Sequence, residues 1–432
     1  MEKILILGGD FGTNEKLKKL NFKSSINQSI ITTHTLVNSN DSSSKLAVKT
    51  ICKIYNQPKL RFKSEIFFIS EISRRIFASL SLRIRLSVAI FGPYRAVSLS
   101  TTLLIFRHIR KLSTAGIIIA FIYGFFRMPK SILIKLMKFR CGDLLELIKL
   151  IETLKITKIV ILTSGYDYFS FLIHLLGDSL PIEFFMLINN WDNPSSKAII
   201  PKNYKKIGVW NYQQINEIKS ISRIDTSKCV VVGSMYADRI YSKYLSNENY
   251  ESLTLKKELG LLFIGQQNKS DEAKEVLKLN EFITSSVSPY KKIVYRPHPT
   301  SRQNQKILKT GKWETENIEI NLDTDIDLRI YDAIICFPTT MILEAILSNV
   351  PTILYVPRHI SYRRDPSNMW KYKHFDFLKK HLPFPIVFSF EELTSLILQG
   401  IPKPKKFDED ILRNLLPRFD ETYEERILRL IL

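Results

Sequence analysis

Cysteine is scarce in this chain, and its four cysteines form no pattern typical of a disulfide or zinc framework. Cys52, Cys141, Cys229 and Cys336 are widely spaced, and the last two lie in apolar runs, where we expect small buried side chains. This pattern argues against disulfide-rich secreted folds and zinc-finger folds, and it predicts a reducing compartment.

Long hydrophobic runs are also absent. The longest, Ala115–Phe126, has 12 residues, whereas a helix that spans a bilayer needs about 20. We therefore expect no transmembrane helix. The N-terminal run Ile4–Leu7 ends at Gly8, which predicts a first buried strand rather than a secretory signal, and hence a cytoplasmic location.

Acidic residues are in deficit, because 42 Asp and Glu stand against 63 Lys and Arg, for a net charge of +21. Residues 74–140 contain 13 Lys or Arg and no Asp or Glu, interleaved with apolar residues at helical spacing. A basic amphipathic insertion of this kind predicts peripheral contact with the anionic inner face of the cytoplasmic membrane. A solvated basic face, or a groove for an anionic acceptor, fits the pattern as well. No nucleic-acid motif is present, so we expect no nucleic-acid partner.

The 432 residues are 45% apolar and suit two α/β domains. Short β-branched runs alternate with segments of helical period, which is the pattern of doubly wound parallel sheets. The division predicted from the sequence is an N-terminal Rossmann-like domain at 1–225, a C-terminal Rossmann-like domain at 226–405 and a helix at 406–432 that packs back. The predicted strands are Ile4–Leu7, Ile159–Leu162, Phe184–Ile188, Val230–Val232, Leu261–Ile264, Lys292–Tyr295, Ala333–Cys336 and Thr352–Val356.

The strongest local motif follows the predicted strand Lys292–Tyr295. Arg296, His298 and Pro299 stand in an Arg-Pro-His-Pro loop whose two prolines fix the backbone. Ligands of open α/β sheets bind at the carboxyl ends of strands, so this loop can direct an imidazole and a guanidinium at a phosphate. A rigid loop with a structural histidine is the alternative.

A second motif follows the predicted strand Ala333–Cys336. Thr339 or Thr340 is expected as the N-cap of a helix, with free backbone N–H groups that could bind an anion. Glu344 lies one turn further on, where its carboxylate could accept ribose hydroxyls or close the cap. Read without its context, the pair is a structural capping box.

The segment after Phe184–Ile188 offers groups for an acceptor. Asp192 could take a proton from an acceptor hydroxyl, and Asn193 and Lys197 could bind the acceptor. An Asx-type turn before Pro194 explains the same residues equally well.

Further loops follow other predicted strands. Gly9 allows a ligand to approach the backbone closely, and Asp10 is a second candidate base. Ser234, Gly265 and Gln266 are expected to line a cleft between the domains. The acidic series at 323–327 resembles a metal-binding motif, but a solvated helix start explains it better, so we expect no metal and no cofactor.

These motifs together resemble those of bacterial GT-B glycosyltransferases of surface-polysaccharide biosynthesis, over roughly residues 155–360. The Arg296–Pro299 loop is similar to the His-Pro motif of bacterial sialyltransferases, capsule Kdo transferases and glycerophosphotransferases of the teichoic-acid type, and Thr339-Thr340 to their Ser/Thr pair. In those families the two elements bind the phosphate of a cytidine nucleotide donor. The acidic pair followed by glycine, which carries the base in the sialyltransferases, is not evident here.

The resemblance implies two Rossmann-like domains that face each other across a cleft. It also implies transfer of a sugar from a CMP-, CDP- or UDP-linked donor to a glycan or lipid-linked acceptor. Two alternatives remain open: an enzyme like the nucleotide-sugar 2-epimerases, which share the architecture, and a non-catalytic membrane-associated protein that binds nucleotide sugars.

Overall fold

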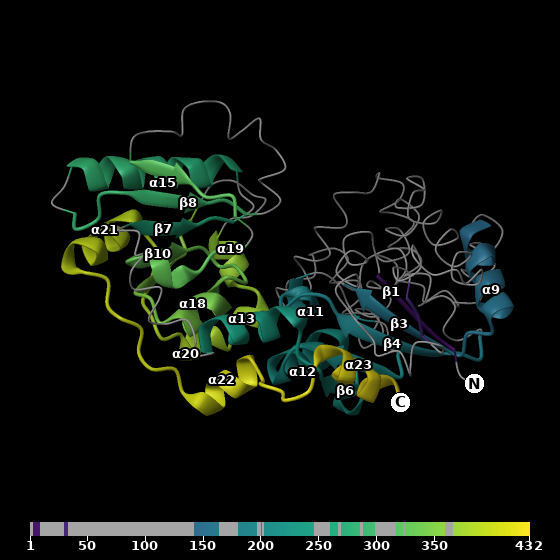
Figure 1. Ribbon diagram of the computed structural model, residues 1–432. Coiled ribbons are helices and arrows are strands. Elements are labelled where there is room, and N and C mark those ends of the chain that lie inside the picture. The colour runs from purple at the N-terminus through teal and green to yellow at the C-terminus, as the bar shows by residue number, and fades with distance from the viewer. Residues whose placement is uncertain are drawn as a thin grey trace, which may run out of the picture. The chain divides into compact units, whose positions relative to one another are not determined.

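The computed structural model describes residues 3–8, 30–32, 142–163, 180–196, 200, 203–245, 260–266, 269–285, 288–298, 317–323, 325–358 and 366–432. These residues form two compact units, each built on a six-stranded sheet (Figure 1). Unit 1 comprises Met1–Ser234 and Phe419–Leu432, and unit 2 comprises Met235–Arg418. The basic insertion predicted at 74–140 lies outside the described residues.

The first sheet is parallel throughout its described strands, in the order β2-β1-β3-β4-β5-β6. Strands β1 and β3 are buried along their whole length, as expected for apolar strands that are covered on both faces. The bounds are β1 Ile4–Gly8, β2 Ile30–Thr32, β3 Lys158–Thr163, β4 Glu183–Ile188, β5 Lys206–Val209 and β6 Cys229–Val231.

The C-terminal helix α23 belongs to this first unit and packs on β5. It begins with a capping box, in which Thr422 and Glu425 bind each other's backbone N–H groups. Gly208 in β5 makes the close approach possible, since a Cβ there would lie 3.1 Å from Leu430. The helices of this unit are α9 Gly142–Leu154, α11 Asn193–Ser196, α12 Tyr212–Glu217, the π-helix η3 Ile218–Ser222, the 3₁₀-helix η4 Thr226–Lys228 and α23 Tyr423–Ile431.

The second sheet is also parallel, in the order β12-β11-β10-β7-β8-β9. Its strands are β7 Leu261–Ile264, β8 Ile293–Arg296, β9 Ile318–Ile320, β10 Ala333–Cys336, β11 Thr352–Tyr355 and β12 Ile386–Val387. The helices of this unit are α13 Met235–Leu245, α15 Lys269–Ser285, η7 Leu328–Ile330, α18 Ile342–Ser348, α19 Pro366–Trp370, η8 Lys373–Phe375, α20 Leu378–His381, α21 Phe390–Gln399 and α22 Glu409–Leu415.

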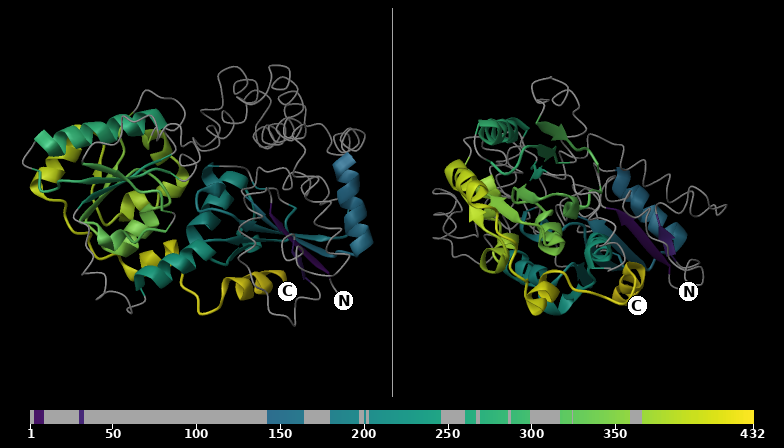
Figure 2. Two further views of the ribbon diagram at one scale, coloured as in Figure 1. Left: turned by 45° about the horizontal axis from the view of Figure 1, so that its top comes forward. Right: turned by 60° about the vertical axis from the view of Figure 1, so that its left-hand side comes forward.

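The two faces of the second sheet carry different helices (Figures 1 and 2). On one face, Phe263, Tyr295 and Ile335 form a buried cluster with Val276 of α15 and Leu393 of α21. Helices α13 and α18 contact each other on the opposite face. Since side chains alternate along a strand, the residues of β7 and β8 that do not join the cluster point toward α13 and α18.

The predicted α/β class with two parallel sheets and a C-terminal helix is confirmed. All eight predicted strands exist with bounds within one residue of those expected, and the sequence missed the short or interrupted strands β2, β5, β9 and β12. The unit boundary lies after Ser234, where the sequence placed it after 225, because β6 pairs with β5 in the first sheet. The chain returns from unit 2 to unit 1 after Arg418, where the sequence placed this boundary after 405, because α22 belongs to unit 2. The arrangement across a cleft stays a prediction.

Candidate functional site

The order of the second sheet defines where a ligand would bind. Numbered from β7 along the chain, the strands run 3-2-1-4-5-6, and the direction of winding reverses between β7 and β10. In open α/β sheets, ligands bind at the carboxyl ends of the strands on either side of such a reversal. The loops after β7, β8 and β10 meet at this edge.

Arg296 is the last residue of β8 and is 6% exposed. Its backbone carbonyl accepts a hydrogen bond from the Gly265 N–H at 2.9 Å, which ties the loop after β7 to the end of β8. Burial lowers the pKa of the Arg296 guanidinium, and the nearby Glu344 carboxylate opposes that shift. The nearby charge of Arg239 lowers the pKa of Arg296 further. The site therefore holds a buried cation beside a carboxylate and a second guanidinium.

His298 follows Arg296 by two residues and is half-buried. Strand β7 lies between β8 and β10, so the strand that leads to His298 and the strand that leads to Thr340 are two strand spacings apart, about 10 Å. The structure thus brings the predicted histidine and hydroxyl pair to one edge of one sheet.

Gln266 is 4% exposed, and both its amide nitrogen and its amide oxygen are buried without a hydrogen-bond partner among the residues that the structure describes. Continuing the alternation along β7 places Gln266 on the same face of the sheet as Arg296, the face of α13 and α18. A buried amide without a hydrogen bond costs about 1–3 kcal/mol of stability. A bound ligand that forms hydrogen bonds with the Gln266 amide would offset this cost.

Gly265 leaves no room for a side chain. A Cβ at this position would lie 2.0 Å from Glu272 Oε1 and 3.0 Å from the Tyr295 ring. Glu272 is itself buried and accepts a hydrogen bond from the Tyr295 hydroxyl at 3.1 Å, which raises the pKa of Tyr295 together with burial. Gly265 therefore lets the backbone pass close to the buried, hydrogen-bonded pair of Glu272 and Tyr295.

The prediction that Thr339 or Thr340 is the helix N-cap is wrong. The cap of α18 is Met341, in helical conformation and without a side-chain cap, because the turn 339–342 already bonds the Ile342 N–H to the Thr339 carbonyl at 3.2 Å. The Thr339 hydroxyl accepts a bond from the Met341 N–H at 3.3 Å. Both threonines are half-buried at the edge, and the Thr339 hydroxyl caps the turn that leads into α18 rather than α18 itself.

Glu344 does not close the cap either. It is buried on α18, where Oε1 accepts a hydrogen bond from the Tyr236 hydroxyl at 2.8 Å and Oε2 accepts one from Tyr244 at 3.2 Å. Burial and the Glu344 charge raise the pKa of both tyrosines, so both remain proton donors. Glu344 thus joins α18 to α13.

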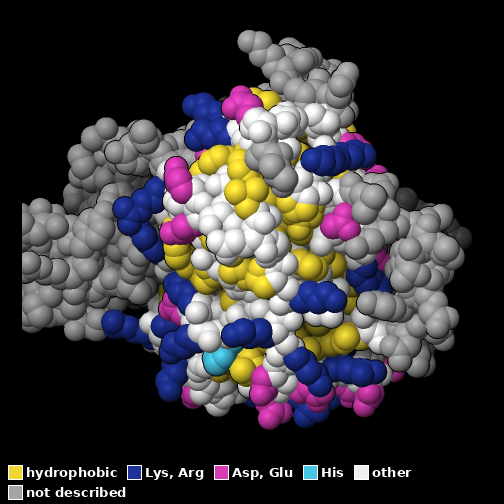
Figure 3. Space-filling view, turned by 90° about the vertical axis from the view of Figure 1, so that its left-hand side faces the viewer, with side chains coloured by type: hydrophobic (Ala, Val, Ile, Leu, Met, Phe, Trp, Pro, Cys, Tyr) yellow, Lys and Arg dark blue, Asp and Glu magenta, His cyan; other side chains and the backbone are white. Residues whose placement is uncertain are grey.

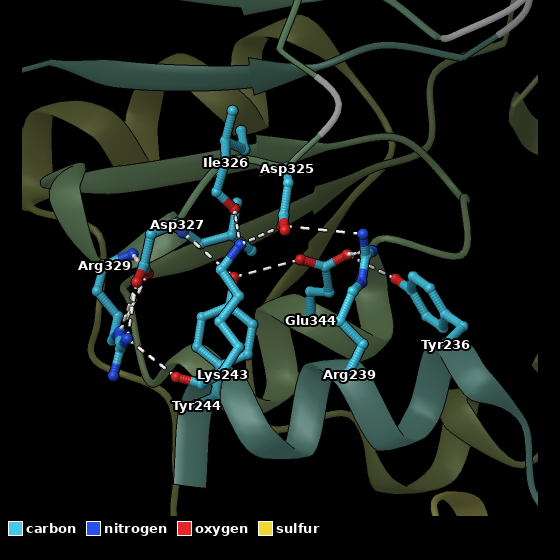
Figure 4. Close-up of polar contacts among 10 residues, drawn as sticks. Tyr236, Arg239, Lys243, Tyr244, Asp325, Ile326, Asp327, Arg329 and Glu344 are labelled. Atoms are coloured by element: carbon cyan, nitrogen blue, oxygen red, sulfur yellow. Dashed lines mark hydrogen bonds and ion pairs between the residues drawn. The ribbon is translucent and has the colours of Figure 1, made fainter. Parts of the chain in front are cut away.

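Sequence reasoning missed α13 entirely. Figure 4 shows Tyr236, Arg239 and Lys243 of this helix directed toward Glu344 and the segment before η7. Lys243 Nζ lies 2.7 Å from Asp325 Oδ1, and Arg329 pairs with Asp327 at the same distance. Asp325 and Asp327 of the acidic series at 323–327 therefore form these ion pairs, and Asp327 also caps η7.

The first sheet carries the other predicted residues. Asp192 lies in the turn before α11, where one of its carboxylate oxygens accepts a hydrogen bond from the Ser196 hydroxyl. Asn193 is 1% exposed, and neither of its amide atoms has a partner within the described ranges. Ser234 is buried at the end of unit 1. The remaining predicted site residues, Gly9, Asp10, Lys197 and Pro299, lie outside the described residues.

Gln214 organises this edge of the first sheet. Its side chain accepts from the Trp210 N–H at 2.7 Å and donates to the Trp191 carbonyl at 2.9 Å. Asn211 caps α12 by accepting from the Gln214 N–H at 2.9 Å. The Trp210 indole donates to the Ile188 carbonyl at 2.9 Å. The loops after β4 and β5 are thereby fixed together by neutral groups.

Among the described helices, none is long and apolar enough to cross a membrane. The described part of the chain also contains no group of three or more His, Cys, Asp and Glu placed to hold a metal ion. On the face of unit 2 shown in Figure 3, Lys and Arg are scattered among acidic and apolar side chains rather than gathered in one patch.

Comparison with known proteins gives structural similarity alone. No protein-family model matches the chain, and no curated protein matches it. A UDP-GlcNAc 2-epimerase from Methanocaldococcus jannaschii, solved with UDP-GlcNAc and UDP, matches with a TM-score of 0.47 and 15% identity, over 100% of this chain and 99% of that one.

Two further solved structures are similar as well. The wall teichoic acid polymerase TagF matches with a TM-score of 0.34 and 10% identity, over 63% of this chain and 75% of its own. A glycosyltransferase from Rickettsia africae matches with a TM-score of 0.34 and 14% identity, over 67% and 76%. The solved structures similar to this chain therefore include both epimerases and glycosyltransferases.

Proposed function

We propose that this chain is a glycosyltransferase that moves a sugar from a nucleotide-activated donor, CMP-, CDP- or UDP-linked, to a glycan or lipid-linked acceptor of a surface polysaccharide. One observation carries the proposal. At the winding reversal of the second sheet, the buried Arg296 guanidinium and the unpartnered Gln266 amide share one face. This is the place at which doubly wound sheets bind ligands.

The donor's phosphate is the group that these side chains suit. Arg296 can bind a phosphate oxygen with two parallel hydrogen bonds, and His298 can donate a further one. The hydroxyls of Thr339 and Thr340 come from the neighbouring loop after β10. Together they would stabilise the negative charge that develops on the leaving nucleotide, the role that a metal ion fills in other transferases.

The acceptor step is assigned to unit 1. Asp192, or alternatively Asp10, would take the proton from the attacking hydroxyl, and Asn193 and Lys197 would bind the acceptor. The basic segment at 74–140 would hold the enzyme at the inner face of the cytoplasmic membrane, near a lipid-linked acceptor.

A nucleotide-sugar 2-epimerase is the second candidate, because the same donor site serves it equally well. The two activities differ in their need for an acceptor. With donor alone, an epimerase converts the sugar, whereas a transferase gives at most slow hydrolysis. Analysis of the sugar after incubation with donor alone therefore separates them.

The first test is a thermal-shift panel of the wild-type chain with CMP, CDP, UDP, GDP and their sugar conjugates. A ligand that binds only the native state raises the melting temperature by mass action. At least one cytidine or uridine nucleotide is expected to do so. A panel without any shift would contradict the proposed donor site.

The second test compares His298→Ala with His381→Ala, a partly exposed histidine on α20 of the same unit. We expect the first variant to lose transfer by about 100-fold, the size typical of a removed charge-stabilising donor, with an unchanged fold. The control should keep wild-type turnover. Equal turnover of the two variants would remove His298 from the site.

A further inference from the structure

Arg239 differs from the other cations of the Figure 4 cluster in how it is bound. Lys243 is 2.7 Å from Asp325, and Arg329 donates to both oxygens of Asp327. Within the described part of the chain, Arg239 has only long ion pairs, 3.9 Å to Asp325 and 3.8 Å to Glu344, and no hydrogen bond. A guanidinium has five N–H donors, so Arg239 keeps its donors available.

The charges around Arg239 leave a positive excess. Among the side chains that the structure describes here, four cations stand against three carboxylates. Lys243 pairs with Asp325 and Arg329 with Asp327, while Arg239 and Arg296 both act on Glu344. The Glu344 oxygens already accept bonds from two tyrosine hydroxyls. The charge of Arg239 lowers the pKa of Arg296, so the two guanidiniums are close enough to repel each other. An anion between them would relieve that repulsion.

Arg239 is nevertheless held in place. Its guanidinium carbon lies 5.4 Å from the centre of the Tyr236 ring, one helical turn earlier on α13, and Glu344 attracts it from α18. Its side chain remains 44% exposed. Its guanidinium is thus oriented by Tyr236 and Glu344 and is also open to solvent, which suits the binding of a ligand from solvent.

Resting on the donor function proposed above, we propose that Arg239 is a phosphate-binding residue that acts together with Arg296. Each guanidinium binds one phosphoryl group, so the site prefers a nucleoside diphosphate to a monophosphate. Guanidinium and phosphate match in a planar, two-bond geometry, which a lysine cannot reproduce. Glu344 is then a positioning residue, because it orients Arg239 and does not contact the ligand.

The test is titration calorimetry of the wild type, Arg239→Gln and Arg239→Lys with UDP, UMP, CDP, CMP and inorganic pyrophosphate, at fixed ionic strength. Arg413→Gln, on an exposed side chain of α22, is the control for the same loss of charge in the same unit. The wild type is expected to bind the diphosphate of its preferred base at least about tenfold more tightly than the monophosphate, the equivalent of about 1.4 kcal/mol, because the second phosphoryl group adds charged hydrogen bonds to Arg239.

Arg239→Gln should remove most of that preference for the diphosphate. It should weaken the binding of the monophosphate by less than about threefold, because the lost guanidinium binds only the second phosphoryl group. Arg239→Lys should restore part of the preference, and Arg413→Gln should bind as the wild type does. An equal effect of Arg239→Gln on diphosphate and monophosphate, or no effect, would overturn the inference while the donor function stands. Pyrophosphate binding that depends on Arg239 without any nucleotide binding would support the inference and refute the donor function. Binding of none of the five probes would overturn both.

Discussion

The carboxyl edges of the two sheets are built alike and equipped differently. Each has a buried amide side chain that finds no partner in the described part of the chain, Asn193 in the segment after β4 and Gln266 in the segment after β7. Around Asn193 the network centred on Gln214 consists of neutral amides, indoles and backbone groups. At the end of β8 in the second sheet, the charges that act on the Arg296 guanidinium come from the Glu344 carboxylate and the Arg239 guanidinium. The Gln214 network of the first edge is neutral, whereas the second edge carries guanidiniums that suit an anionic ligand.

Two buried arginines give the largest test of this contrast. Arg426 in unit 1 is fully buried and donates to the backbone carbonyls of Val232 and Glu421 at 2.7 and 2.6 Å. Arg426→Met should lower the free energy of unfolding by about 3 kcal/mol, because two charged hydrogen bonds are lost, and leave nucleotide affinity unchanged. Urea denaturation and calorimetry measure the two quantities.

Arg296→Gln is the matched substitution in unit 2. It should weaken nucleotide binding by about 100-fold, the equivalent of about 2.7 kcal/mol. If Arg426→Met weakened nucleotide binding as much as Arg296→Gln does, the distinction between a structural and a ligand-binding arginine would be lost.

Gly265→Ala is expected to have the next largest effect. The new Cβ would overlap with Glu272 and the Tyr295 ring, which are buried and bonded to each other, so both must move. Forced packing of this kind costs about 1–3 kcal/mol, and the displaced loop should also weaken nucleotide binding. A melting temperature and an affinity equal to those of the wild type would show that the edge of the second sheet is not closely packed.

The sequence predicted strands well where burial on both faces requires a continuous apolar run, as in β7 and β10. It missed β5, because Gly208 interrupts the run to admit α23, a requirement that arises only when distant segments pack together. It singled out Arg296 and Gln266 because each follows an apolar run that predicts a strand. It could not find Arg239, since the partner that orients it, Glu344, lies more than 100 residues further along the chain.

The two unpartnered amides allow a smaller test. Gln266→Met and Asn193→Leu replace each amide with an apolar side chain of similar size, which removes an unsatisfied buried group. Each variant should be as stable as the wild type or more stable by about 1 kcal/mol. Gln266→Met alone should weaken nucleotide binding, and Asn193→Leu alone should reduce acceptor use. Loss of stability in either variant would mean that the amide has a structural role.

The smallest effect is one of pH and concerns the tyrosines of unit 2. Burial raises the pKa of Tyr241, whose hydroxyl donates to the Leu416 carbonyl, to about 12. In the unfolded chain the same phenol ionises near pH 10. Above pH 10 the unfolded state therefore releases a proton that the folded state retains, so the stability from this group is complete below pH 10 and falls as the pH rises toward 12.

Between pH 9 and 11, urea unfolding should show the wild type losing up to about 1 kcal/mol more than Tyr241→Phe, a figure reduced for the partial exposure of the ring. Tyr212→Phe, at an exposed position in unit 1, should follow the wild type. Tyr241→Phe lacks the hydrogen bond at every pH, which lowers its free energy of unfolding by a constant amount. This constant does not affect the comparison, because only the change in the free energy of unfolding between pH 9 and pH 11 is compared. Parallel slopes for all three proteins would show that Tyr241 ionises as easily in the folded state as in the unfolded one. The contact of Tyr241 on α13 with the Leu416 carbonyl, near the end of unit 2, would then be open to solvent.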